Sequence, residues 1–300
     1  MKQTASDLPA VRASGRLALA LVLALLVPLA ASAGFQEHGY FFQTHVFPDD
    51  NFTQLLGIND EGRIAGYHNS TNFFGFTFVP PDHFTAENFP GAAQTQVVGI
   101  NDSGDTAGFY IDDGNTNHGF LDTRQSFVTV DFPGTTFNQL LGLNRFEQAA
   151  GYYADTNGND HPYIYHAASG VFQSLILPSA VSAQATGIND SQMVCGFYID
   201  SLGTNHGFIF LANGSLQTLD FPRSTFTQAL GVNDRGEVVG SYLDSSNSSH
   251  GFVYENGRFT SIDDPHGVGT TVVNGINNIG QLVGFYVDSD TNTDGFLATP

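Results

Sequence analysis

The sequence predicts an all-β fold: a six-bladed β-propeller with four antiparallel strands in each blade. Three observations carry this prediction. A Gly-[Ile/Leu/Val]-Asn tripeptide recurs six times at intervals of 42 to 45 residues, a period typical of propellers and solenoids. The chain after residue 33 shows the two-residue alternation of β-strands and no helical period. The last repeat also lacks one strand, and the start of the chain carries a matching segment.

Each repeat presents the same signals in the same order. A proline precedes each tripeptide, so the repeats start near residues 48, 90, 133, 178, 222 and 265. A second glycine with an aromatic residue follows, and a Gly-Phe pair opens the third strand in five of the six repeats. Because one four-stranded meander buries little apolar surface, the units must pack against one another. We expect blades at residues 49–89, 91–132, 134–177, 179–221, 223–264 and 266–300.

The two ends of the chain predict a closed ring. The sixth repeat ends at Gly295-Phe-Leu-Ala-Thr-Pro300, one strand short of a complete unit. Near the N-terminus, Gln43-Thr-His-Val-Phe-Pro48 matches Gln217-Thr-Leu-Asp-Phe-Pro222. We expect residues 42–47 to supply the missing outer strand, which removes free sheet edges. Residues 42–300 then form a single propeller domain, and residues 34–41 are a short lead-in.

Residues 1–33 have the features of a secretory signal peptide. Basic residues precede an apolar run from Leu17 to Leu29, and Ala31-Ser32-Ala33 supplies the small residues of a cleavage site. The apolar run is shorter than the roughly 20 residues of a membrane span. We predict an exported protein, secreted or periplasmic, without a transmembrane span after cleavage. We expect it to be a monomer.

The charge of the mature chain restricts its partners. Residues 34–300 hold six arginines, no lysine and 28 acidic residues, a net charge of −22. This composition argues against a basic surface for nucleic acid or anionic lipid. The single cysteine, Cys195, excludes an intramolecular disulfide, and its alignment with apolar positions of other repeats predicts a buried side chain.

The repeated motifs resemble those of the HAF family of extracellular repeat proteins. The second repeat states the pattern in full, with Gly99-Ile-Asn-Asp-Ser-Gly104, Gly108-Phe-Tyr110 and His118-Gly-Phe120. The likeness covers residues 42–300, although the third repeat reads Leu143-Asn-Arg-Phe-Glu147 where the others have Asn-Asp-x-Gly or a close variant. The resemblance implies export and a repeat scaffold, and it brings no reaction and no catalytic residue.

An Asp-x5-His pattern recurs in four blades. Acid–base pairs and metal ligands use these residue types, but a catalytic group is needed once rather than four times. The aspartate ends the second strand and the histidine opens the third, so a hydrogen bond between them would fix the hairpin loop. We interpret the pairs as structural: Asp112/His118, Asp155/His161, Asp200/His206 and Asp244/His250.

A glutamine precedes the first glycine by three residues in five blades. These side chains fall on the innermost strand, near the entrance of the channel. They could form an amide ladder between neighbouring blades, or a polar funnel for a sugar or another small ligand. The structural interpretation is favoured, because buried amides usually bond within the fold. The residues are Gln54, Gln96, Gln139, Gln184 and Gln228, and the sixth blade has Val272 instead.

One loop has the alternating oxygen side chains of a calcium site. Its candidate ligands are Asp288, Asp290, Asn292 and Asp294. The loop lacks the glycine and the glutamate that complete such a loop, and asparagine-rich and aspartate-rich hairpins have this composition for turn reasons alone. Calcium is the one cofactor that the sequence suggests.

Residues that break the repeat on the loop face are the candidates for binding, since loops on a rigid frame usually carry function. No nucleophile–base arrangement and no phosphate-binding glycine loop is recognisable. We therefore favour a non-catalytic binding protein for a glycan, a peptide or a cell-surface protein. The alternatives are an exported hydrolase or lyase with a site at the channel entrance, and a structural envelope or matrix component. The candidate binding residues are His45, Asp49, Asp50, His68, Arg223 and His266.

Overall fold

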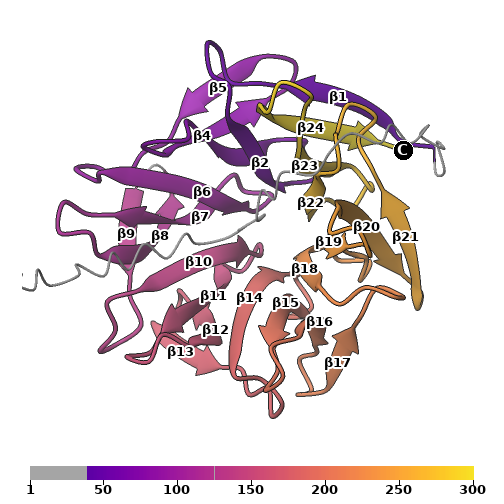
Figure 1. Ribbon diagram of the computed structural model, residues 1–300. Helices are drawn as coiled ribbons and strands as arrows, with labels where there is room; N and C mark the ends of the chain where they lie inside the picture. Colours follow the sequence, from indigo (N-terminus) through magenta and orange to yellow (C-terminus); the bar gives the residue numbers. More distant parts are fainter. Residues whose placement is uncertain (1–38, 125) are drawn as a thin grey trace, which may run out of the picture. The chain divides into compact units, whose positions relative to one another are not determined.

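The computed structural model describes residues 39–124 and 126–300, and these form six four-stranded antiparallel sheets arranged as the blades of a ring (Figure 1). The predicted all-β six-bladed propeller is therefore confirmed. The signal peptide predicted for residues 1–33 lies outside the described residues. The described part of the chain contains no helix that is long and apolar enough to cross a membrane.

The first three blades follow one another in the sequence, each running from the innermost strand outward. Blade 1 consists of β2 (Thr53–Ile58), β3 (Ile64–His68), β4 (Phe74–Val79) and β5 (His83–Ala86). Blade 2 consists of β6 (Gln94–Ile100), β7 (Thr106–Ile111), β8 (Asn117–Thr123) and β9 (Ser126–Val130). Blade 3 consists of β10 (Asn138–Leu143), β11 (Gln148–Ala154), β12 (Asp160–His166) and β13 (Val171–Ser174).

The last three blades repeat this order, and the sixth draws its outer strand from the N-terminal end. Blade 4 consists of β14 (Ser182–Ile188), β15 (Val194–Ile199), β16 (Asn205–Phe210) and β17 (Leu216–Leu219). Blade 5 consists of β18 (Thr227–Val232), β19 (Val238–Leu243), β20 (Ser249–Glu255) and β21 (Arg258–Ile262). Blade 6 consists of β22 (Thr271–Ile276), β23 (Leu282–Val287), β24 (Thr293–Thr299) and β1 (Phe41–His45).

Ring closure occurs as the sequence predicts. Strand β1 pairs antiparallel with β24, from Phe41 opposite Thr299 to His45 opposite Gly295. The strands of both chain ends lie side by side in Figure 1, where β1 is indigo and β24 is yellow. Pairing β1 with β24 satisfies the backbone groups that β24 would otherwise expose as an edge.

The glycine of the repeated tripeptide is required because the six inner strands crowd around the channel. A bulge precedes this glycine in every blade, for example between Leu140 and Gly142. A Cβ atom on Gly142 would lie 2.8 Å from the Cα atom of Gly187 in the next blade. The equivalent glycines make similar approaches around the ring, so a larger residue at these positions would push neighbouring blades apart.

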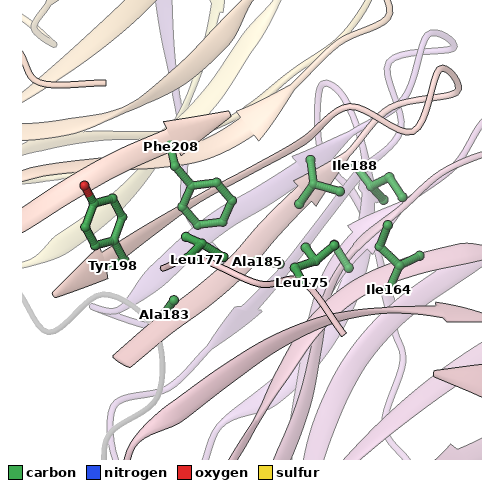
Figure 2. Packing of buried hydrophobic residues seen from close by; sticks show 10 residues of the cluster. Ile164, Leu175, Leu177, Ala183, Ala185, Ile188, Tyr198 and Phe208 are labelled. Atoms are coloured by element: carbon green, nitrogen blue, oxygen red, sulfur yellow. The ribbon is translucent and has the colours of Figure 1, made fainter. Parts of the chain in front are cut away.

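The hydrophobic core is divided into clusters, one at each boundary between adjacent blades. Figure 2 shows the cluster between blades 3 and 4, where Ile164 and Leu175 lie near Ile188 and Phe208. Phe208 is fully buried, as is the equivalent aromatic residue of every other blade. Each such burial contributes roughly 1.5–3 kcal/mol. Because every cluster spans two blades, packing against both neighbours stabilises each blade.

A closed cycle of asparagines joins the six blades. In each blade the tripeptide asparagine donates from Nδ2 to the backbone carbonyl of the corresponding asparagine in the next blade, at 2.9 to 3.3 Å. Its Oδ1 accepts backbone N–H groups of its own β-turn, as Asn189 does from Ser191 and Met193. One side chain therefore fixes a turn within its blade and links that blade to the next. The members are Asn59, Asn101, Asn144, Asn189, Asn233 and Asn277.

The boundary between blades 1 and 2 contains buried polar groups. The Thr106 hydroxyl donates to the Glu87 carboxylate, and Asp122 is only 8% exposed. Burial raises the pKa of Glu87 to about 7, and the nearby charge of Asp122 adds to this effect. The equivalent positions of the other blades are mostly apolar, so this boundary departs from the repeat.

We predict that Asn189→Ala lowers the free energy of unfolding by about 2–4 kcal/mol, because one buried and two partly buried hydrogen bonds are lost at roughly 1 kcal/mol each. Denaturant titration measures the change. Asn213→Ala is the matched control, since the exposed Asn213 accepts one turn hydrogen bond, from the N–H of Ser215. It should cost less than about 1 kcal/mol. Equal losses for the two variants would contradict the role assigned to the asparagine cycle.

Candidate functional site

The loops of the propeller gather on two faces. We call one the hairpin face. It contains the loops between the second and third strands of each blade and the segments that lead into each inner strand. The two kinds of segment touch: the Asn117 N–H donates to the Thr136 carbonyl, and the Thr293 N–H donates to the Asn51 carbonyl. The opposite face contains the turns between the first and second strands. All six candidate binding residues lie on or beneath the hairpin face, in the positions that follow.

The structure brings each Asp-x5-His pair together. The histidine Nε2 atom lies 3.5 Å from the aspartate Oδ2 atom in blades 2, 4 and 5. In blade 3 the separation of His161 and Asp155 is 3.2 Å, a hydrogen bond. The aspartate also accepts backbone N–H groups of its own loop, as Asp200 does from Leu202 and Thr204. This arrangement fixes the hairpin loop.

Three of these histidines form a hydrogen bond with a second carboxylate, which the sequence interpretation missed. The Nδ1 atoms of His118, His206 and His250 lie 2.7, 2.8 and 2.9 Å from carboxylate oxygens at the end of the outer strand. A sequence signal existed, since an aspartate stands two residues before the repeat proline in all three blades. In blade 3 that position is Ile176, so His161 has one aspartate. The second carboxylates are Asp131, Asp220 and Asp263.

The pKa values reflect these contacts. Backbone N–H donors, and then His161, lower the pKa of Asp155 to about 2. Backbone N–H donors likewise lower the pKa of Asp112 and Asp200. The pKa of His250 is raised, first by its hydrogen bond with Asp263 and less by Asp244. Each of these shifts favours the charged form of the group.

Aromatic stacking supports the same loops. Phe221 stacks on Tyr242 with a centroid distance of 3.5 Å, and Tyr242 in turn faces His250 at 5.2 Å. Blades 2 and 3 repeat the stack. The phenylalanine belongs to the segment that leads into the inner strand, so the stack joins this segment to the hairpin loop.

The inner-strand glutamines do not form a ladder from blade to blade. Gln54 and Gln139 accept from Tyr67 and Tyr152 of their own blades, at 2.6 and 2.8 Å. Gln184 reaches the preceding blade, where its Nε2 donates to Asp160 at 2.8 Å. Gln96 is 4% exposed, and Gln228 is half-buried. Two of the five glutamines thus bond across the first two strands of their own blade, and a third bonds to the preceding blade.

In blade 1 the repeat is broken by a histidine between two phenylalanines. His68 Nδ1 lies 2.8 Å from Asp50 Oδ2, and the imidazole stacks on Phe47 with a centroid distance of 3.5 Å. On the other side, the ring of Phe74 lies 5.7 Å away. Phe74 occupies the position of His118 in blade 2 and is 38% exposed. Asp49, also exposed, adopts a positive φ of 62° in the loop before Asp50.

In blade 6 the repeat is broken by carboxylates. Asp264 replaces the stacking phenylalanine, and its Oδ1 accepts from the backbone N–H and from Nδ1 of His266, at 2.8 and 3.0 Å. Asp294 replaces the histidine and lies opposite Tyr286 in the strand register. The Tyr286 hydroxyl lies 2.9 Å from the Thr44 hydroxyl of β1. Burial raises the pKa of Asp264, of Asp294 and of Tyr286, the last to about 12.

These two irregular blades are neighbours, and we call their shared part of the hairpin face the 6–1 junction. It comprises residues 47–52 and 68–74 of blade 1 and residues 264–268 and 286–294 of blade 6. A parallel bridge between Phe52 and Thr293 joins them.

The remaining two candidate binding residues lie outside the junction. His45 lies close by on β1, where burial lowers its pKa and its ring centroid lies 4.8 Å from that of Phe78. Arg223 is separate, in the loop before β18 of blade 5 with φ 70°.

The suggested calcium loop has the geometry of the other hairpin loops. Asp288 Oδ1 accepts from the N–H groups of Asp290 and Asn292, and Asn292 Nδ2 donates to Asp288 Oδ2. The same aspartate-to-backbone pattern occurs in blade 5 at Asp244. Among residues 39–124 and 126–300, no group of three or more His, Cys, Asp or Glu side chains is placed to hold a metal ion.

The opposite face contains the channel mouth, a cavity of about 70 Å³ lined by the repeated apolar-Asn-x triplets. Its rim carries Asp60, Asp102, Asp190 and Asp234 together with Arg145 and Asn278. Rim carboxylates and Asn278 accept the backbone N–H of the preceding blade in five of the six steps. Arg145 interrupts the cycle, and its Nε lies 3.1 Å from Asp190 Oδ2. These oxygens thus hold the blades together.

Cys195 is fully buried, as predicted, and burial raises the pKa of its thiol to about 12. A thiol in this environment is not a nucleophile at physiological pH.

Comparison with known proteins finds similar folds among solved structures. No protein-family model matches the sequence, and no curated protein matches it. Solved structures do match. SapL1 lectin in complex with α-methyl fucoside has 8% identity and a TM-score of 0.56, with 83% of this chain and 93% of the lectin covered. A mutant Aleuria aurantia lectin in complex with Fucα1-6GlcNAc has 11% identity and a TM-score of 0.52, with 83% and 93% covered.

TolB from Acinetobacter baumannii has 14% identity and a TM-score of 0.53, with 79% of this chain and 64% of TolB covered. At these identities, the likeness to the three structures concerns the fold alone.

We predict that His250→Ala destabilises the protein more at pH 5.5 than at pH 8.5. The folded-state pKa of His250 is raised, so the stabilisation from its two carboxylates is complete below the unfolded value of about 6.5 and is lost as pH rises through the folded value. We expect a loss of about 1 kcal/mol at pH 5.5, measured by denaturant titration at both pH values. His83→Ala, which replaces an exposed histidine on β5, is the control and should change the stability little at either pH. The same loss for His250→Ala at both pH values would contradict the charged pairing.

Proposed function

We propose that this protein is an exported, non-catalytic glycan-binding protein whose ligand site is the 6–1 junction. One observation carries the proposal: the partly exposed ring of Phe74 lies beside the Asp50–His68 pair on a closed and rigid frame. Four of the six candidate binding residues gather there, namely Asp49, Asp50, His68 and His266.

The chemistry of this surface suits a sugar. One face of a pyranose ring is apolar and packs on an exposed aromatic side chain, while its hydroxyl groups need donors and acceptors at the rim. At the junction, Phe74 supplies the exposed aromatic side chain on which the sugar ring would pack. The exposed Asp49, Asn51 and Asn72 and the half-buried Asp50 supply oxygens and amide groups. Because Phe47 stacks beneath His68, the histidine is already held in place before a ligand binds, which lowers the entropy cost of binding.

The structural neighbours add support of a general kind. Two of the propellers similar to this chain are lectins solved with fucosides. Their frames and this one share an architecture, and carbohydrate binding is one of the functions that such a frame supports. The export that the N-terminal sequence predicts would place the protein where extracellular glycans are found.

A second candidate is a hydrolase or lyase with its site at the channel mouth of the opposite face. The observation in its favour is Asp190, whose pKa is raised by burial and by the charge of Asp234. A carboxyl group with a raised pKa in a cavity is a candidate general acid. The backbone N–H and the charge of Arg145 oppose this increase in the pKa of Asp190. This argues against a general acid there, so glycan binding is the preferred function.

We predict that Phe74→Ala reduces the affinity for glycans selected on a glycan array by about tenfold or more, because the stacking surface is lost. Titration calorimetry with the purified glycan measures the affinity. Phe146→Ala is the matched control: Phe146 is 53% exposed but lies on the opposite face, between β10 and β11. The control should bind as the wild type does.

Three results would count against the proposal. An array without any bound glycan would remove the assigned function. Equal losses for Phe74→Ala and Phe146→Ala would remove the assigned site. Conversion of a glycan to a product, detected by mass spectrometry and lost in Asp190→Asn, would favour the enzyme.

A further inference from the structure

Blade 6 contributes unusual charge to the 6–1 junction. Asp264 stands where the other blades have phenylalanine or leucine, and Asp294 stands where four blades have histidine. None of the six arginines among residues 39–124 and 126–300 lies in blade 6 or in residues 47–52 and 68–74. Asp49, Asp50, Asp288 and Asp290 add further negative charge to the same surface. The junction therefore favours a ligand with positive charge.

The Asp264 carboxylate lacks a full set of partners. Its side chain has no exposed surface, and its Oδ1 is occupied by His266. Its Oδ2 is buried and has no hydrogen-bond partner. A buried carboxylate oxygen without a donor is costly. Its replacement of an apolar stacking residue weakens blade 6, so a reason other than packing is needed for its presence.

The two replaced positions flank Tyr286. Asp294 is directly opposite Tyr286 in the strand register. In blade 5 the residue at the position of Asp264 stacks on the equivalent tyrosine at 3.5 Å, which places Asp264 on the other side of the Tyr286 ring. The charges of both aspartates raise the pKa of Tyr286, in keeping with this placement. Asp294 is half-buried, whereas the side chain of Asp264 is fully buried, so Asp294 is the aspartate that a ligand can reach.

We propose that the glycan bound at the 6–1 junction carries a protonated amino group, and that Asp294 is the residue that pairs with it. This inference rests on the proposed glycan-binding function. An ammonium group is a point charge with three hydrogen-bond donors. It relieves the repulsion between Asp294 and its neighbours Asp288 and Asp264. An amino sugar such as glucosamine combines this ammonium group with a pyranose ring that can pack on the side chain of Phe74.

An ammonium group fits the junction better than a metal ion does. A metal ion needs several ligands that converge at fixed short distances. In the described ranges, 39–124 and 126–300, no three acidic or histidine side chains converge in this way. An ammonium group needs fewer acceptors, and cations bind favourably near exposed aromatic rings such as that of Phe74.

The test compares three oligosaccharides of the same length: a glucosamine oligomer, an N-acetylglucosamine oligomer and a galacturonic acid oligomer. Titration calorimetry with the full mature chain at pH 6 and low salt should give the glucosamine oligomer about tenfold higher affinity than the N-acetylated one. The acidic oligomer should not bind. Asp294→Asn should remove the preference for the free amine while leaving the weaker binding of the N-acetylated oligomer unchanged.

Two further variants keep the test interpretable. Asp220→Asn removes the same charge from the hairpin face in blade 4, where the side chain of Asp220 is 51% exposed, and it should keep the preference. Asp294→His installs the residue that blades 2 to 5 carry, so it should fold and also lose the preference.

The outcomes separate the two proposals. Equal or tighter binding of the N-acetylated oligomer, or of a neutral glycan on the array, would overturn the amino-sugar inference and leave glycan binding intact. An unchanged preference in Asp294→Asn would overturn the role of Asp294. Absence of binding to every saccharide would overturn both proposals.

Discussion

The close packing of six inner strands around one axis is the constraint on which the structure depends. Glycines such as Gly142 let adjacent blades approach to a distance that a side chain would prevent. At the ends of these strands, the asparagine cycle ties each turn to the next blade, and the last member, Asn277, bonds to Asn59 of the first blade. Because the cycle closes, no blade can shift without breaking contacts on both of its sides. The pairing of β1 with β24 completes the ring at its outer edge.

Because the blades repeat, side chains that serve the fold can be distinguished from side chains that could bind a ligand. Most of the chemically active side chains on the hairpin face are repeated, and each holds its own loop, as Asp200 and His206 do. A group that all blades need for folding is a poor candidate for a unique site. The departures from the repeat are more informative, since they weaken local packing without an evident structural gain. Phe74 and Asp264 are departures of this kind, and the ring closure places both at one junction.

The sequence predicted the fold because its signals are local and repeated. The tripeptide glycine, the second glycine and the Gln43–Pro48 segment were enough to predict six blades and the way in which the ring closes. The pairing of Asp112 with His118 was predictable from spacing, whereas the second carboxylate, Asp131, comes from a more distant strand and was overlooked. The glutamine contacts depend on which way each side chain turns, and spacing alone does not determine that. The 6–1 junction joins segments that are at least 190 positions apart in the sequence, so only the closed ring shows that they are neighbours.

Hydrogen exchange of residues 34–300, with and without the tightest-binding glycan from the array, tests the central claim most directly. The claim is that the departures from the repeat form one ligand site at the 6–1 junction. Bound glycan should slow amide exchange in residues 47–52, 68–74 and 286–294, and leave the turns of the opposite face unchanged. Protection centred on residues 58–62, 100–104 and 188–192 of the channel mouth, or spread equally over all six hairpin loops, would contradict it.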